Sequence, residues 1–139
     1  MVGDKILQMT VRDTRRGDYE MFVSWWDGHV GWEAPLEHAL PDSGFLVEGD
    51  GFPVVAGWLY RTDSSIAWLE WIISNPQASK EERADALPIL IERLTHEARM
   101  LGFKIVFTST NNKRLLAQYE EAGFATMEKD VIHLVRRIG

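Results

Sequence analysis

The sequence predicts an α/β fold in which helices cover the faces of a mixed β-sheet. Three segments rich in β-branched and aromatic residues follow one another in the middle of the chain, at 44–48, 53–60 and 66–73. Helical and extended patterns then alternate along the rest of the sequence. Strands that first meander and then alternate with helices indicate a sheet with antiparallel and parallel neighbours. The 139 residues match the length of one average domain, so we expect a single domain over 1–139.

Periodicity and breaker residues set the expected elements. In chain order, they are a strand over 5–12, helices over 19–26 and 32–40, strands over 44–48, 53–60 and 66–73, a helix over 80–101, a strand over 104–108, a helix over 112–121, and strands over 124–127 and 131–137. The last two strands are expected to pair with each other and close the sheet.

Local signals support the elements of the first half. In the first strand, Leu7, Met9 and Val11 alternate with the intervening residues. Asp18 is suited to cap the helix that follows, and Asp27-Gly28 is a breaker pair that ends this helix.

Turn signals separate the three central strands. Asp50-Gly51 is a favoured hairpin turn, and the polar run over 62–65 makes a second turn. Asn75-Pro76 ends the third strand.

The helix over 80–101 has the clearest pattern. Ser79 and Glu82 form a capping box before it, and Gly102 ends it. Pro88 removes one backbone hydrogen bond inside the helix, which predicts a kink. The apolar residues recur at three- and four-residue steps and form one stripe, which consists of Ala84, Leu87, Ile91, Leu94, Ala98 and Leu101.

The composition excludes several classes of function. The formal net charge of −6 and the pI of about 5.2 argue against nucleic-acid partners, which require clustered Lys and Arg. The absence of cysteine excludes disulfides and thiolate metal sites, and the four histidines lack the spacing of metal ligands. No segment is long and apolar enough for a membrane span and no signal peptide is visible, so we expect a cytoplasmic protein without membrane partners.

Tryptophan is unusually frequent. Three of the six tryptophans lie within 25–32. Tryptophan fills a core or an interface between subunits, or it forms the aromatic wall of a ligand site. Both interpretations stay open, and the first keeps a homodimer among the expected partners.

The element order and several local signatures resemble the GCN5-related N-acetyltransferases from end to end. Val11-Arg12, followed six residues after Arg12 by Asp18, is similar to the first strand and helix cap of that family. Gly57 is similar to the glycine that its third strand often carries.

The most specific match lies near the C-terminus. Asn112 precedes Tyr119 by seven residues, and Gly123-Phe124 follow. The resemblance implies that the fourth and fifth strands of the family fold, here 66–73 and 104–108, part to admit acetyl-CoA. It also implies that the diphosphate of this cofactor binds at the N-terminus of the long helix. The cofactor contacts that follow are Ile72, Ile73, Ser74, Lys80, Arg83 and Asn112.

The expected phosphate-binding segment departs from the family pattern, which reads Gln/Arg-x-x-Gly-x-Gly/Ala. No glycine lies over 76–101. Side chains would therefore crowd the phosphates, and Glu81, Glu82 and Asp85 would repel them. The capping box also uses backbone donors that the cofactor would need. The two neighbouring cations offset this repulsion only weakly, because exposed ion pairs contribute about 1 kcal/mol or less.

Two residues are candidates for acid–base chemistry. The resemblance places Tyr119 beside the cofactor sulfur, where its hydroxyl could protonate the departing thiolate. The alternative is a tyrosine that packs on the last strands. Glu70 lies mid-strand among apolar residues, a setting that would raise its pKa and make it the candidate base. The alternative is a glutamate on a solvated strand face.

Two functional hypotheses remain open. The first is an acyl-CoA-dependent N-acyltransferase that moves an acetyl group from acetyl-CoA to the amine of a small molecule or a protein. The second is a pseudoenzyme of the same fold that has lost acetyl-CoA binding and acts as an interaction or small-molecule-binding module. Tyr119 and the fold favour the first, whereas residues 77–87 favour the second. The sequence does not specify the acceptor, although 25–32 lies where the resemblance places its pocket.

Overall fold

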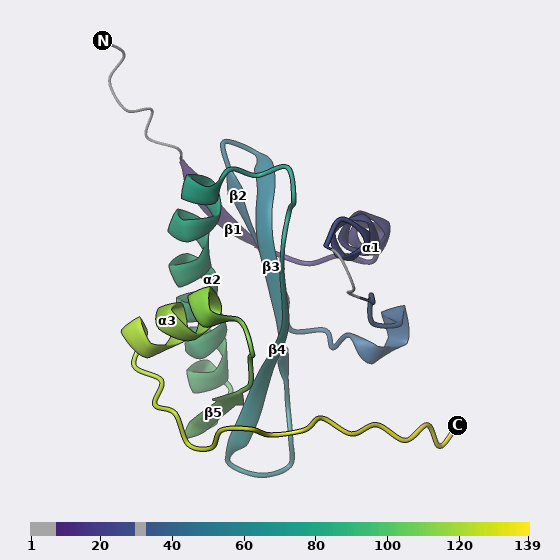
Figure 1. Ribbon diagram of the computed structural model, residues 1–139, viewed down its shortest axis with the longest axis vertical. Helices are drawn as coiled ribbons and strands as arrows, with labels where there is room; N and C mark the ends of the chain where they lie inside the picture. The colour runs from purple at the N-terminus through teal and green to yellow at the C-terminus, as the bar shows by residue number, and fades with distance from the viewer. Residues whose placement is uncertain (1–7, 30–32) are drawn as a thin grey trace.

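A five-stranded sheet with the order β1-β2-β3-β4-β5 forms the centre of the structure (Figure 1). The computed structural model describes residues 8–29 and 33–139. β1 to β4 are antiparallel neighbours, whereas β4 and β5 are parallel, which confirms the predicted mixed sheet. The strands are β1 (Met9–Asp13), β2 (Gly44–Gly49), β3 (Phe52–Tyr60), β4 (Ile66–Ser74) and β5 (Ile105–Thr108).

Helices cover both faces of this sheet. Figure 1 shows α1 (Tyr19–Asp27) on one face, and α2 (Lys80–Met100) and α3 (Lys113–Glu121) on the other. We call these the α1 face and the α2 face. Two short 3₁₀ turns, η1 (Arg16–Asp18) and η2 (Glu37–Ala39), complete the described elements. No described helix has the length and apolarity of a membrane span.

Each face has its own apolar cluster, because successive side chains of a strand point to opposite faces. The cluster of the α1 face is aromatic, and consists of Phe22, Trp25, Trp26, Leu46, Ala56, Trp58 and Ile73. The cluster of the α2 face is mainly aliphatic and includes Val47, Val55, Leu59, Leu69, Leu90, Ile91 and Leu94.

The hairpin and the long helix are formed as their sequence signals predict. Asp50 and Gly51 have φ angles of 51° and 81°, which is the left-handed conformation that this tight turn needs. The Ser79 hydroxyl accepts from the Glu82 amide at 3.0 Å, and the Glu82 carboxylate accepts from the Ser79 amide at 2.9 Å. Gly102, with a φ of 90°, follows the end of the helix.

The apolar stripe of α2 is only partly as predicted. Ile91, Leu94 and Ala98 are buried, but Ala84 and Leu101 are exposed. Ala84 lies about 200° around the helix from buried Ala86, so it faces away from the sheet. Leu101 lies beyond the last helical residue. The complete buried set is Ala86, Leu90, Ile91, Leu94 and Ala98.

Asp18 stands at the start of α1 as predicted, but it does not cap the helix with its side chain. Its carboxylate binds both terminal nitrogens of the Arg12 guanidinium at 2.9 Å and accepts from the Arg15 amide at 2.7 Å. The hydrogen bond from Arg12 lowers the pKa of Asp18 below its ordinary value. This pair ties the end of β1 to the start of α1.

Other predicted boundaries need correction. The helix expected over 32–40 is reduced to η2 within the described residues, and residue 32 lies outside them. The first strand is described from Met9 only, because residues 5–7 also lie outside the described part.

Residues 124–139 contain no strand, so the two strands predicted after α3 are not formed. Their apolar and β-branched residues favour extended backbone, but a strand also needs a neighbour to receive its hydrogen bonds. Figure 1 shows this segment passing from the side of α3 to the side of α1. Val131 is 60% exposed and Leu134 91% exposed.

Leu94 provides the test of helix orientation. Its side chain is fully buried, so Leu94→Ala should lower the free energy of unfolding by about 2–5 kcal/mol through the cavity it leaves. Leu101→Ala, on an exposed residue of the same segment, should change it by about 0.5 kcal/mol or less. Urea denaturation measures both, and a loss below about 1 kcal/mol for Leu94→Ala would mean that this face of α2 is not packed.

Candidate functional site

The parallel strands β4 and β5 separate halfway along β4. They are paired from Ile66–Ile105 to Leu69–Thr108, and β5 ends at Thr108. β4 continues to Ser74 without a strand on that side among the described residues. We call this region, residues 69–74 and 108–112, the strand fork. It is the separation that the family resemblance implies.

A β-bulge reshapes β4 at the fork. The register between β3 and β4 shifts after Ala56, and Trp71 has a φ of 63°, which only a small fraction of non-glycine residues adopt. A Cβ on the facing Gly57 would lie 3.1 Å from the Cγ1 atom of Ile72, and 3.2 Å from the Cδ1 atom of Leu94. Glycine at 57 therefore lets the bulged strand and α2 approach β3 closely.

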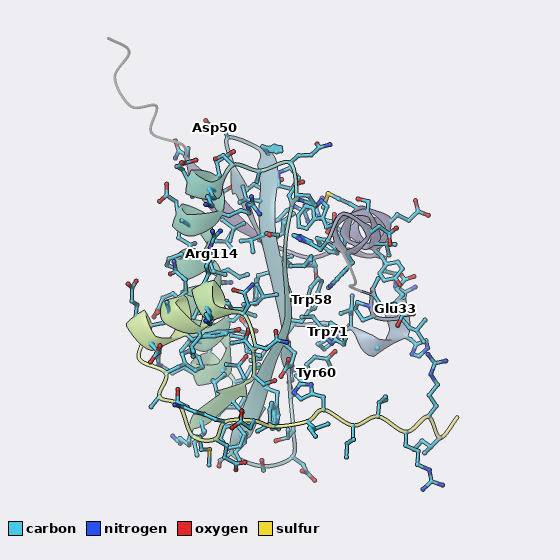
Figure 2. The ribbon with its side chains drawn as sticks, in the orientation of Figure 1. Glu33, Asp50, Trp58, Tyr60, Trp71 and Arg114 are labelled. Carbon is cyan, nitrogen blue, oxygen red and sulfur yellow. The ribbon has the colours of Figure 1, made fainter. Side chains whose placement is uncertain are left out.

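The bulge directs two side chains to the α1 face. Glu70 is the register partner of Trp58, whose side chain lies in the α1-face cluster, and directly opposed residues share a face. The Trp71 ring centroid lies 6.2 Å from that of Trp26, edge to face. Figure 2 shows Trp58, Tyr60 and Trp71 together on the side of the sheet that carries α1.

Glu70 is half-buried and hydrogen-bonded. The Ser109 hydroxyl donates to its carboxylate at 3.2 Å, and the same hydroxyl lies 3.1 Å from the Nε2 atom of His133. Burial raises the pKa of Glu70 above its ordinary value, while Ser109 and His133 partly oppose this rise. The carboxylate is therefore a stronger base than an exposed glutamate.

Tyr119 reaches the same point from the α2 face. Its side chain is 3% exposed, and its hydroxyl lies 3.2 Å from that of Thr108. The Thr108 hydroxyl also donates to the Leu69 carbonyl at 2.7 Å. Burial raises the pKa of Tyr119 well above its ordinary value, so its hydroxyl keeps its proton at neutral pH.

The two candidate residues thus meet at the fork from opposite faces. Leu69 and Thr108 are the last paired residues, and Glu70 and Ser109 come directly after them. Because strand side chains alternate between faces, the first pair belongs to the α2 face and the second to the α1 face. Glu70 and Tyr119 are close enough for the charge of Glu70 to contribute to the raised pKa of Tyr119.

The predicted cofactor contacts on β4 differ in what they can offer. The part of β4 that extends beyond its last pair with β5 contains Ile72, Ile73 and Ser74. Ile73 is 1% exposed within the α1-face cluster, so only its backbone is available to a ligand. The Ser74 carbonyl accepts a hydrogen bond from the Nε2 atom of His29 at 3.1 Å.

The start of α2 fits a diphosphate poorly. The Gln77 amide donates to the Asn75 side chain, and the Ala78 amide to the Asn75 carbonyl. The capping box then uses the amides of Ser79 and Glu82. These backbone donors are therefore already satisfied within the protein.

The remaining predicted contacts lie at helix ends. Lys80 is exposed in the first turn of α2, and the Arg83 side chain donates weakly, at 3.4 Å, to the Ser79 carbonyl. Asn112 caps α3, because its side-chain oxygen accepts from the amides of Arg114 and Leu115 at 3.0 Å each. Asn112 lies at the fork, but its oxygen is occupied.

Two tryptophans of the tryptophan-rich segment, Trp25 and Trp26, belong to the core. Trp25 is 4% exposed and Trp26 3% exposed, and Trp32 lies outside the described residues. Among the described residues, the exposed tryptophans are on β4, where Trp68 and Trp71 are 38% and 39% exposed. No group of three His, Asp or Glu side chains within 8–29 and 33–139 could hold a metal ion.

Sequence reasoning missed Thr108, Ser109 and His133. Thr108 ends the strand predicted over 104–108 and Ser109 follows it directly, which is where polar site residues often lie. Nothing in the sequence indicates that the His133 side chain lies at the strand fork.

Comparison with known proteins supports the fold. No protein-family model matches the sequence, and no curated protein matches it. Among solved structures, N-acetylglutamate synthase from Neisseria gonorrhoeae, in complex with coenzyme A and L-arginine, aligns with a TM-score of 0.68 and 19% identity. The alignment covers 91% of this chain but 29% of the synthase.

Two smaller enzymes align over most of their length. The ribosomal-protein alanine N-acetyltransferase from Escherichia coli has a TM-score of 0.69 and 16% identity, over 87% of this chain and 80% of its own. An aminoglycoside N-acetyltransferase in complex with CoA has a TM-score of 0.62 and 18% identity. This alignment covers 98% of this chain and 100% of the aminoglycoside enzyme. The chain therefore has the fold of the GCN5-related N-acetyltransferases.

Proposed function

We propose that the protein transfers an acetyl group from acetyl-CoA to the amine of a small molecule or a protein. The observation that carries the proposal is the half-buried, hydrogen-bonded Glu70 carboxylate at the strand fork, with the Tyr119 hydroxyl on the other face. The structural similarity to N-acetyltransferases supports the same activity.

Each candidate residue has a distinct chemical role. Bound acetyl-CoA would supply the activated acetyl group. Glu70 removes a proton from the acceptor ammonium, because only the neutral amine has a lone pair for attack. Its raised pKa makes this transfer more favourable than for an exposed glutamate. Tyr119, which stays protonated, donates its proton or a hydrogen bond to the departing thiolate.

The acceptor would approach from the α1 face. Glu70 lies on that face, with the accessible ring of Trp71 next to it in the chain. Tyr60 is close enough for the charge of Glu70 to raise the pKa of its hydroxyl. Aromatic rings beside a carboxylate attract cations, which suits an ammonium group.

A second candidate function is a non-catalytic binding module of the same fold. The observation in its favour is the start of α2, where the amides of Gln77, Ser79 and Glu82 donate within the protein and no glycine opens the segment. The fork fits the thioester end of the cofactor, whereas this segment fits the diphosphate end poorly.

Release of free CoA decides between the two functions. Because the chain has no cysteine, a thiol-reactive dye detects only CoA and gives no background from the protein. The assay combines acetyl-CoA with a panel of polyamines, aminoglycosides, amino acids and peptides with free N-termini. Thiol release that depends on the amine supports the transferase, and its absence across the panel supports the binding module.

Glu70→Gln and Tyr119→Phe separate the two catalytic roles. Glu70→Gln should lower kcat/KM by about 10²–10⁴-fold and remove the rise of activity with pH that accompanies ionisation of the carboxyl group. Tyr119→Phe should lower kcat and leave acetyl-CoA affinity nearly unchanged, since its proton matters only when the thiolate leaves. Rates as a function of pH test both, and a Glu70→Gln enzyme with the wild-type pH profile would exclude Glu70 as the base.

The acidic start of α2 should limit cofactor affinity. Replacing Glu82 and Asp85 with glycine removes two charges and two side chains, although the lost cap and each new helix glycine cost about 1 kcal/mol apiece. The double variant should be less stable yet bind acetyl-CoA more tightly, and the gain should shrink as salt screens the charges. Calorimetric titration at two salt concentrations measures this. Low-micromolar binding by the wild type without a gain in the variant would contradict the role given to this segment.

We further propose that the segment 131–138 mediates homodimerisation. Five of its residues are apolar and between 60% and 92% exposed, namely Val131, Ile132, Leu134, Val135 and Ile138. A second copy presents the same apolar side chains, so packing of Ile132, Leu134 and Ile138 from both copies about a two-fold axis would cover them and leave His133, whose side chain contacts Ser109, outside the interface.

Sedimentation velocity tests this dimer. The wild type should sediment as a dimer, and Leu134→Asp should shift it to the monomer because a charge at the interface cannot be buried. Met100→Asp, at an exposed residue at the end of α2, is the matched control and should stay dimeric. A monomeric wild type at high micromolar concentration would contradict the proposal.

A further inference from the structure

The C-terminal segment returns to the strand fork through His133. The side chains of Glu70, Ser109 and His133 form a continuous row, with Ser109 in the middle at 3.2 Å from one and 3.1 Å from the other. The three residues come from β4, from the loop after β5 and from the segment after α3. Burial falls along the row, because Glu70 and Ser109 are partly buried whereas His133 is exposed.

We propose that Ser109 and His133 form a proton relay that carries the proton accepted by Glu70 away from the acceptor site to solvent. The inference rests on the proposed function, in which Glu70 is the base. Ser109 and His133 act through Glu70 and need not touch the acceptor.

Every proton in the relay is accounted for, and each bond that forms is matched by one that breaks. After Glu70 has accepted a proton, its O–H bond breaks and the proton goes to the Ser109 oxygen. At the same time Ser109 gives its own proton to the Nε2 atom of His133, where an N–H bond forms. The imidazolium then loses a proton to water. The carboxylate is regenerated, the serine is unchanged, and nothing is oxidised or reduced.

The surroundings of Glu70 explain why a relay is useful. Burial raises its pKa, so the carboxyl group holds the proton that it must lose before another turnover. Among the described residues, the other titratable groups that interact with it are Tyr60 from β3 and Tyr119 from α3, and burial raises the pKa of both. Neither tyrosine can accept the proton, whereas imidazole is the side chain suited to shuttle protons near neutral pH.

Chemical rescue separates a relay from a purely structural contact. His133→Ala should lower the rate of amine-dependent CoA release by roughly tenfold or more, and added imidazole should restore it because position 133 is open to solvent. Ser109→Ala should lower the rate of CoA release by a similar factor, and imidazole should not restore it, because no hydroxyl then links Glu70 to His133. Ser109→Thr keeps a hydroxyl and should keep most of the rate. His96→Ala, at an exposed histidine on α2, is the control and should behave like the wild type.

A second readout does not depend on activity. The Glu70 carboxyl can be titrated by carbon-13 NMR in the wild type and in His133→Ala. Because His133 lowers the pKa of Glu70, its removal should raise that pKa. Wild-type rates in His133→Ala, rescue of Ser109→Ala by imidazole, or an unchanged Glu70 titration would each overturn the relay. Absence of CoA release already in the wild type would instead overturn the proposed function, and the relay with it.

Discussion

The end of pairing between β4 and β5 is the feature on which the site depends. Parallel strands that stayed paired to Ser74 would use the backbone groups of β4 on this side in ladder hydrogen bonds and leave none for a ligand. Instead the last ladder pair is Leu69–Thr108, and the bulge at Trp71 turns β4 away. The left-handed conformation of Trp71 costs about 1–3 kcal/mol. Contacts of its ring with Trp26 and of its indole with Tyr60 help to hold it there.

The two halves of the expected cofactor site, the strand fork and the start of α2, differ in the groups that they offer to a ligand. At the fork, β4 has no strand among the described residues on its β5 side, and polar side chains gather from both faces. At the start of α2, the capping box satisfies the amides of Ser79 and Glu82, and carboxylates lie at the positive end of the helix. The first arrangement favours a ligand and the second stabilises the helix without one. Affinity for acetyl-CoA is therefore expected to depend on the thioester end.

The sequence predicts best what local interactions decide. The Ser79–Glu82 capping box and the Asp50-Gly51 hairpin are formed as expected because all the atoms involved are neighbours in the chain. The side-chain cap by Asp18 was predicted wrongly because Arg12 on another element competes for its carboxylate. The two C-terminal strands were predicted wrongly because a strand requires a hydrogen-bonded neighbour, which the local sequence cannot supply. His133 reaches the fork through tertiary structure alone.

Amide chemical shifts measured during titration with acetyl-CoA test most directly whether the strand fork is the ligand site. If it is, the amides of residues 70–74 and 109–112 should shift first and most, with smaller changes at the start of α2 around Lys80. Larger shifts at the start of α2 than at the fork, or no shifts at millimolar acetyl-CoA, would contradict the assignment of the fork as the site.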